Sequence, residues 1–187
     1  MPLQKVKQGQ FNFTPDFFTP RLSVLKIGWW ITFSQNCNYI HPPENAQHQK
    51  SWLKWGGLSF DLNPFEKHEN SALGGFRHNP DDQCIEVLDY WHKDGQTDNG
   101  IGRDPLDAVV FDETFPWWLE IDYGNKTVAQ VFFIRGRKIV QVQQFNRLPR
   151  ISWQVGAWAG GQLPATQDMD FDFTRIRRWV NGIPALV

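Results

Sequence analysis

The sequence has almost no charge imbalance and no long apolar run. Its 187 residues carry 19 Lys and Arg against 20 Asp and Glu, a formal net charge of −1. With no excess of cationic side chains to neutralise phosphates, we expect no nucleic-acid partner. The mean hydropathy is −0.49, and no run reaches the ~18 apolar residues that a transmembrane helix needs. We therefore expect no transmembrane segment either.

Leader-like features and cysteines are also scarce. The first residues, MPLQKVKQGQFNF, contain no apolar stretch of the kind found in signal peptides. This predicts a cytoplasmic chain or, if a leader has been removed, a secreted or periplasmic one. Cys37 and Cys84 are the only cysteines, too few for a disulfide framework and without the C-x-x-C spacing of a zinc site. One disulfide bridge and two buried free thiols are both compatible with the sequence.

Nothing in the sequence divides the chain into parts. It has no internal repeat, no low-complexity tract and no shift in composition. All-β sandwiches of this length commonly form one domain. We predict a single domain over residues 1–187, in which residues 1–20 form an N-terminal extension.

Strand signals dominate the chain. Runs rich in β-branched and aromatic residues, separated by Gly, Asn and Asp, cover residues 22–37, 52–62, 83–95, 116–145, 150–161 and 168–176. Strands at ~8–12-residue spacing indicate an antiparallel sandwich or barrel. No amphipathic pattern of 12 or more residues predicts a long helix. The best candidate for a helical turn is Glu44–Lys50, which follows two prolines.

Aromatic residues are unusually frequent, with ten Trp and 15 Phe. Trp is large and amphipathic and is rarely buried completely, so we expect some indoles to contact a sugar, an apolar partner or another protein. Adjacent strand residues face opposite sides of a sheet. We therefore expect only one member of each pair, Trp29 with Trp30 and Trp117 with Trp118, to be buried.

The last predicted strand alternates between carboxylates and apolar side chains. We expect the apolar row to pack inward, namely Met169, Phe171 and Phe173. We expect the carboxylate row to face water, namely Asp168, Asp170 and Asp172. Carboxylates also suit Ca²⁺. Alternate strand positions lie ~7 Å apart, too far for all three to hold one ion. Asp170 is therefore the candidate ligand for a structural calcium, and we expect no other cofactor.

Two groups of residues could carry chemistry. Glu120 and Asp122, in the stretch WWLEIDYGN, share a strand face, as a pair of glycosidase carboxylates would. This stretch resembles the catalytic strand of laminarinase-type β-jelly-roll glycoside hydrolases. That motif continues to a second Glu as the general acid/base, whereas this sequence has Gly124, or Asn125 after a bulge, and neither can donate a proton.

The second group contains Arg77, Glu86, Tyr90 and His92, which could come together on neighbouring strands. Tyr90 and His92 share a strand face. Such a set, completed by a row of Gln residues, resembles the site of β-jelly-roll polysaccharide lyases. In those enzymes Arg neutralises a uronate carboxylate while His or Tyr removes the C5 proton. We expect Gln141 and Gln143 to supply the Gln row.

Four segments together resemble a known family. WLKWGGLSF, NSALGGFRHN, IEVLDYWHKDG and GAWAGGQLPATQDMDFDF follow in this order between residues 52 and 173. They are similar to a family of small bacterial β-sandwich proteins related in shape to concanavalin-like lectins and glucanases. The resemblance implies an all-β, antiparallel, jelly-roll sandwich with at most short helical turns. The family has no established activity, so no catalytic residue follows from it.

These observations favour a non-catalytic module that binds an oligo- or polysaccharide or associates with a cell surface. Sugar rings stack on indoles while their hydroxyl groups bond to polar side chains. The candidate binding residues are Trp91, Trp117, Trp118, Trp153, Trp158, Arg77, Gln141 and Gln143. The alternatives are a polysaccharide lyase, less favourably a glycoside hydrolase, or a structural protein that oligomerises through its Trp surface. The oligomeric state does not follow from the sequence.

Overall fold

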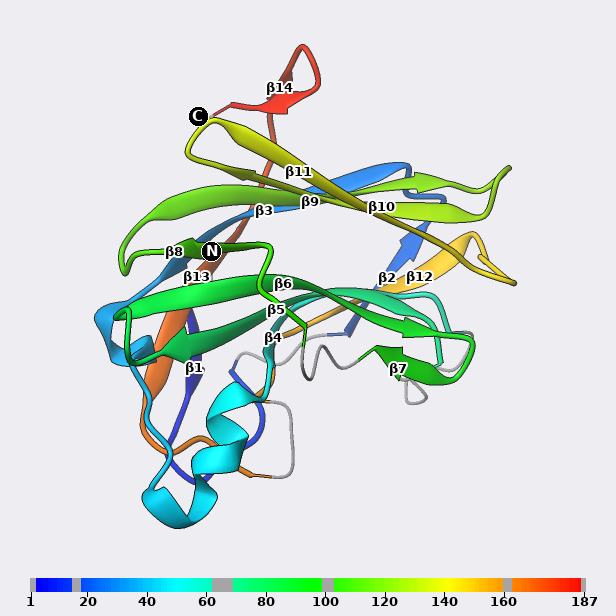
Figure 1. Cartoon of the computed structure of the whole chain (residues 1–187). Helices are drawn as coiled ribbons and strands as arrows, with labels where there is room; N and C mark the ends of the chain where they lie inside the picture. The colour runs from blue at the N-terminus through cyan, green and yellow to red at the C-terminus, as the bar shows by residue number, and fades with distance from the viewer. Residues whose placement is uncertain (1–2, 15–17, 62–68, 99–102, 160–162, 186–187) are drawn as a thin grey trace.

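The protein is an antiparallel β-sandwich of two sheets, as predicted. A computed structural model describes residues 3–14, 18–61, 69–98, 103–159 and 163–185. Figure 1 shows the two layers facing each other, with β3, β9, β10 and β11 in one and β4, β5, β6 and β7 in the other. We call these layers sheet A and sheet B.

All strand pairings in both sheets are antiparallel. Sheet A has the order β1 (Leu3–Val6), β13 (Met169–Arg175), β3 (Lys26–Phe33), β9 (Thr114–Asp122), β10 (Thr127–Ile134), β11 (Arg137–Gln144). Sheet B has the order β2 (Phe18–Leu22), β12 (Ile151–Val155), β4 (Leu53–Ser59), β5 (Ser71–Asn79), β6 (Cys84–Lys93), β7 (Gln96–Asp98), and β8 (Asp107–Val109) also pairs with β6.

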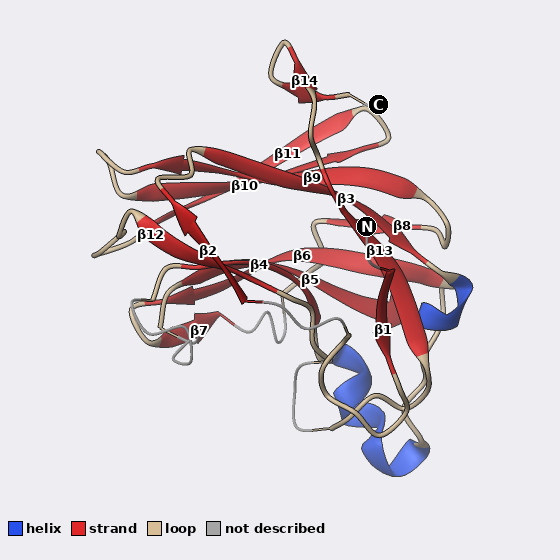
Figure 2. Ribbon diagram, turned by 180° about the vertical axis from the view of Figure 1, so that it is seen from behind, coloured by secondary structure: helices blue, strands red, loops and turns tan. Residues whose placement is uncertain are grey.

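Short elements complete the fold. Two 3-10 turns, η1 (Gln35–Cys37) and η2 (Pro43–Lys50), follow β3, and η2 covers the helical turn predicted at Glu44–Lys50. The hairpin of β14 (Trp179–Val180) and β15 (Ile183–Pro184) lies beyond sheet A (Figure 2). Residues 1–20, expected as an extension, include β1 and the start of β2, which are edge strands of the two sheets.

Aromatic rings fill the space between the sheets. Alternate residues of β3 point inward, and Trp29 stacks on Trp117 and Phe173 at centroid distances of 5.2 and 4.9 Å. Trp55 packs so closely on β5 that a Cβ at Gly74 would lie 1.7 Å from its ring. The core therefore depends on a glycine at that one position, as well as on the large apolar residues around it.

The alternating C-terminal strand packs as predicted on its apolar side. Met169, Phe171 and Phe173 are buried in the core. Asp168 is exposed and its carboxylate binds Lys7 at 2.6 Å. Asp170 is only half-exposed, because its main chain lies against Asn36, whose Oδ1 accepts its N–H at 3.0 Å.

Both cysteines are buried free thiols, which answers the question left open by the sequence. Burial raises the pKa of Cys37 far above its ordinary value, and its Sγ donates to the carbonyl oxygen of Asp170 at 3.1 Å. Such a protonated, enclosed thiol is a packing residue and not a nucleophile.

The expectation for the Trp pairs holds for one pair and is wrong for the other. Trp29 is buried and Trp30 is partly exposed. Trp117 and Trp118, however, are 0% and 1% exposed. Trp118 lies on the outer side of sheet A, where Trp179 of the C-terminal hairpin packs against it at 5.7 Å. A sheet covered on both sides buries both faces of a strand.

Candidate functional site

The outer face of sheet B, which points away from sheet A, brings together several predicted site residues. The register of β5 and β6 sets Ser71 beside His92, Leu73 beside Tyr90 and Arg77 beside Glu86. Because partners in a ladder share a face, all six lie on one side, opposite the core residues Ala72 and Phe76. Leu73, Leu88 and Tyr90 form a second small apolar cluster there with Trp52 and Val155.

Lys54 lies at the centre of this face and is the residue that sequence reasoning missed. It stands beside Gly75 in the ladder, only 7% exposed. Its ammonium lies 4.3 Å from the ring centroid of Tyr90 and 5.7 Å from that of Trp158. Burial lowers its pKa from 10.5 to about 8. A single charge between Trp52 and Trp55 in an otherwise apolar strand was the signal in the sequence.

No carboxylate, hydroxyl or carbonyl group in the described residues pairs with the Lys54 ammonium, whose polar contacts are the two rings. A buried amine without an acceptor costs free energy, which a cation–π contact offsets only in part. Trp153, beside Ser59 on the same face, also has a buried indole N–H without a hydrogen-bond partner. Among the described residues, this face therefore holds two donors, the Lys54 ammonium and the Trp153 indole N–H, that have no hydrogen-bond acceptor.

The lyase-like set of Arg77, Tyr90 and His92 does not converge. The three share a face, but Arg77 and Leu73, the partner of Tyr90, are four residues apart on β5, about 13 Å along the strand. Arg77 is also occupied: it forms an ion pair with Glu86 at 2.5 Å and lies 4.3 Å from the ring of Trp52. The cation near Tyr90 is Lys54 instead.

His92 is held in place by a neighbouring strand. Its Nδ1 lies 2.6 Å from the hydroxyl oxygen of Ser71, and its ring meets Tyr90 edge-on at 5.4 Å. The imidazole is 2% exposed. Its contacts make His92 a support for the Tyr90 ring.

The predicted sugar-binding residues divide between different parts of the molecule. Trp153 and Trp158 are partly exposed and pack on the outer cluster of sheet B with Tyr90. Trp91 and Trp117 are core residues instead, because strand alternation turns them toward the opposite sheet. Trp118 lies under the C-terminal hairpin. We therefore leave Trp91, Trp117 and Trp118 out of the site.

The glutamine row does not complete this face either. Gln141 and Gln143 belong to β11 at the edge of sheet A and are half-buried beside Gln130 and Val128 of β10. Arg77 belongs to sheet B. The expected groove combining these residues is not formed, because the two strands lie in different layers.

Glu120 and Asp122 share the outer side of sheet A, and both serve the fold. Burial raises the pKa of Glu120, but the indole N–H of Trp118 at 2.8 Å and the ammonium of Lys26 at 3.0 Å outweigh it, so that the pKa is lowered. Hydrogen bonds from Asn125 and Gly124 lower the pKa of Asp122 and close the following turn. Neither carboxyl group is poised as a proton donor.

Asp170, the candidate calcium ligand, belongs to no cluster of metal-binding side chains among the described residues. Within the described ranges, no three His, Cys, Asp or Glu side chains are gathered so that they could hold one ion. The calcium assignment stays a prediction. Among the same residues, no helix has the length and apolar character to cross a membrane.

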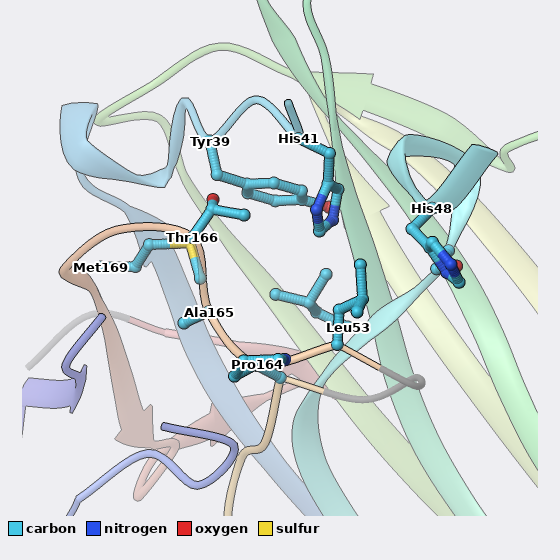
Figure 3. Close-up of a pocket in the computed structure, with 11 residues that line it drawn as sticks. Tyr39, His41, His48, Leu53, Pro164, Ala165, Thr166 and Met169 are labelled. Carbon is cyan, nitrogen blue, oxygen red and sulfur yellow. The ribbon is translucent and has the colours of Figure 1, made fainter. Parts of the chain in front are cut away.

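The structure has a cavity near η2, but this cavity is too small to hold a saccharide. Figure 3 shows Tyr39, His41 and Thr166 on one side of it, and Leu53 and Pro164 on the other. Its volume is about 20 Å³, room for one water molecule. Burial and the neighbouring His48 lower the pKa of His41.

The comparisons with known proteins support the fold. No protein-family model matches the chain. No curated protein matches its sequence. A functionally unknown protein from Saccharomyces cerevisiae has a TM-score of 0.51 at 9% identity, over 94% of this chain and 87% of that one. The CBM2 module of an evolved Dit protein of Lactobacillus casei BL23 phage J-1 also has a TM-score of 0.51, at 7% identity, over 96% and 82% of the two chains.

The basic winged bean lectin has a TM-score of 0.44 at 10% identity, over 92% of this chain and 91% of that one. The predicted antiparallel β-sandwich is confirmed by the two sheets of the structure. At these identities the likenesses show the fold alone. The relation to the small bacterial family stays a prediction.

Proposed function

We propose that this protein is a non-catalytic carbohydrate-binding module whose saccharide site is the outer face of sheet B. The partly exposed rings of Trp153 and Trp158 supply surfaces for the apolar C–H faces of sugars, the buried ring of Tyr90 supports them, and Lys54 supplies a charged donor. The phage module with a similar fold carries a carbohydrate-binding name. That name supports the proposal without assigning a ligand.

The observation that carries the proposal is the unpaired ammonium of Lys54. Lys54 is only 7% exposed, and its ammonium lies near two aromatic rings. Among the described residues, no anion or hydroxyl group pairs with this ammonium. A bound ligand with a carboxylate would supply the missing acceptor and recover part of the desolvation cost. We therefore expect uronic-acid saccharides to bind more tightly than neutral ones.

The test is a calorimetric titration with two sets of oligosaccharides: oligogalacturonates, which are acidic, and cello-oligosaccharides, which are neutral. Wild-type protein is expected to bind the acidic set, and Trp158→Ala and Lys54→Met to weaken binding about tenfold or more, as expected for a lost stacking ring or charged contact. Trp30→Ala is the matched control, because Trp30 is a partly exposed Trp of sheet A. Absence of binding to both sets, or equal losses in all three variants, would refute the proposal.

A polysaccharide lyase is the second candidate, and Lys54 is the observation that favours it. An amine with a pKa of about 8 beside Tyr90 can accept a proton near neutral pH. In such a reaction the base removes the C5 proton, a C4–C5 double bond forms as the C4–O bond breaks, and the departing oxygen takes up a proton from water. Growth of the ultraviolet absorbance of unsaturated uronates on incubation with oligogalacturonates would favour the lyase, and binding without it favours the module.

A further inference from the structure

A second site lies at the place where the chain passes from sheet B to sheet A. An open cleft of about 610 Å³ is lined by residues of β2, β3 and β12 and by the segment that ends β13 and leads to β14. Four of its eight lining residues are cationic: Arg21, Lys26, Arg175 and Arg177. None is a carboxylate. This is an uneven distribution for a chain with a net charge of −1.

The guanidinium of Arg21 points into the cleft beside a neutral partner. Its Nε and a terminal nitrogen donate to the side-chain oxygen of Gln154 at 3.1 and 2.5 Å. Burial and the positive charge of Arg175 lower the pKa of Arg21. Among the described lining residues no carboxylate lies between these two guanidinium groups, an arrangement that raises the energy of the cleft without a bound anion.

Arg175 and Arg177 are exposed side chains at the end of β13. Across the described residues, neither has a hydrogen bond or an ion pair to a protein group. The fold instead anchors the main chain between them, where the N–H of Ile176 donates to the carbonyl oxygen of Gly28 at 2.8 Å. The main chain that carries these two side chains is thus fixed on sheet A, and their guanidinium groups keep unused donors.

Lys26 forms the rigid wall of the cleft. Its ammonium contacts Glu120 at 3.0 Å, donates to the carbonyl oxygen of Gly182 at 2.9 Å and lies 4.2 Å from the ring of Trp179. Its charge is compensated by Glu120. The excess positive charge comes from the three arginines.

We propose that this cleft binds a small anion with two or more phosphate or sulfate groups. Guanidinium groups offer paired N–H donors that match such oxygens. Arg21, Arg175 and Arg177 come from both sheets, so one anionic group cannot satisfy all three as well as a ligand that spans them. The cleft volume falls within the range of small-molecule sites. Gln154 faces the interior, opposite to Trp153, so this site is separate from the proposed saccharide face.

The test is calorimetric titration at low ionic strength with two probes, tripolyphosphate and a sulfated disaccharide. We expect wild-type protein to bind at least one of them, with an affinity that falls as salt is added. Arg175→Gln and Arg177→Gln are expected to weaken binding by about tenfold each, because each removes a charge-assisted contact. Arg175→Lys keeps the charge but not the paired donors, so its affinity should lie between those of the wild-type protein and Arg175→Gln.

The control is Lys93→Gln, which removes one exposed positive charge at the β6–β7 turn, on the opposite edge of sheet B from β2. It should leave affinity unchanged. The probe that binds more tightly identifies the source of the anion, and either result supports the site. Failure of both probes to bind wild-type protein would overturn the proposal, as would equal weakening by Lys93→Gln and Arg175→Gln. Thermal melts confirm that each variant is folded.

Discussion

Replacing Lys54 with methionine is expected to make the folded protein more stable at neutral pH. Burial lowers the pKa of Lys54 from 10.5 to about 8, so the unfolded state binds more protons than the folded state between these pH values. The free energy of unfolding therefore rises as the pH increases from about 8 to 10.5. This pKa difference corresponds to a cost of about 3 kcal/mol for the charged amine at neutral pH, at ~1.36 kcal/mol per pKa unit.

Part of this cost is already offset in the wild-type protein. The contacts of the ammonium with the rings of Tyr90 and Trp158 contribute about 1 kcal/mol. Methionine fills a similar volume without charge. We therefore expect Lys54→Met to raise the free energy of unfolding by about 2 kcal/mol at pH 7, the difference between these two contributions.

Urea unfolding followed by tryptophan fluorescence measures this difference. With a slope of about 2 kcal/mol per molar urea, the midpoint of Lys54→Met should lie about 1 M above wild type at pH 7. The gap should narrow as the pH approaches 10.5, the ordinary pKa of lysine, because the wild-type amine becomes neutral. Lys93→Met, at an exposed turn, is the control and should leave the midpoint unchanged.

A lower midpoint for Lys54→Met at pH 7 would refute the reasoning, because it would mean that the ammonium has a stabilising partner within the chain. The combination of higher stability and lost saccharide binding in the same variant would be the signature of a residue retained for a ligand.

Three further predictions concern the fold. Phe171→Ala should lower the free energy of unfolding by about 3–5 kcal/mol through the cavity that it leaves. Asp170→Asn should leave the thermal melt unchanged. A calcium-dependent rise in melting temperature that Asp170→Asn abolishes would contradict the assignment of Asp170 to a row that only faces water. Gly74→Ala should prevent stable folding, because its Cβ would lie 1.7 Å from a core indole. A Cβ at Gly75 would meet its nearest atom at 3.5 Å, so Gly75→Ala should melt like wild type. Equal melting temperatures for the two variants would disprove the clash. Glu120 has a lowered pKa, so the stability that its carboxylate contributes is present above pH 4.5 and is lost as the pH falls through its folded-state pKa. Glu120→Gln should lower the free energy of unfolding by less than about 1 kcal/mol at pH 7, and the two free energies should converge in urea titrations at acid pH. A constant difference at every pH would contradict the ion-pair explanation.

The sequence by itself determined the local pattern of this protein. Alternation of Asp and apolar residues was enough to predict that Phe171 and Phe173 pack inward, because neighbouring side chains of a strand must face opposite sides. The position of the 3-10 turn η2 followed from two prolines in the same way. These are properties of a few consecutive residues, and tertiary contacts do not alter them.

Only the tertiary structure decided which faces are covered and which distant residues meet. One of Trp117 and Trp118 was expected at a surface, but Trp179, which covers Trp118, comes from the end of the chain. Arg77 and Tyr90 do share a face, yet the register places them rows apart and puts Lys54 beside the tyrosine. Likewise, Arg21 and Arg175 meet only because β2 and β13 end at the same cleft. Such contacts depend on strand order and on what covers each sheet, and strand periodicity carries no information about either.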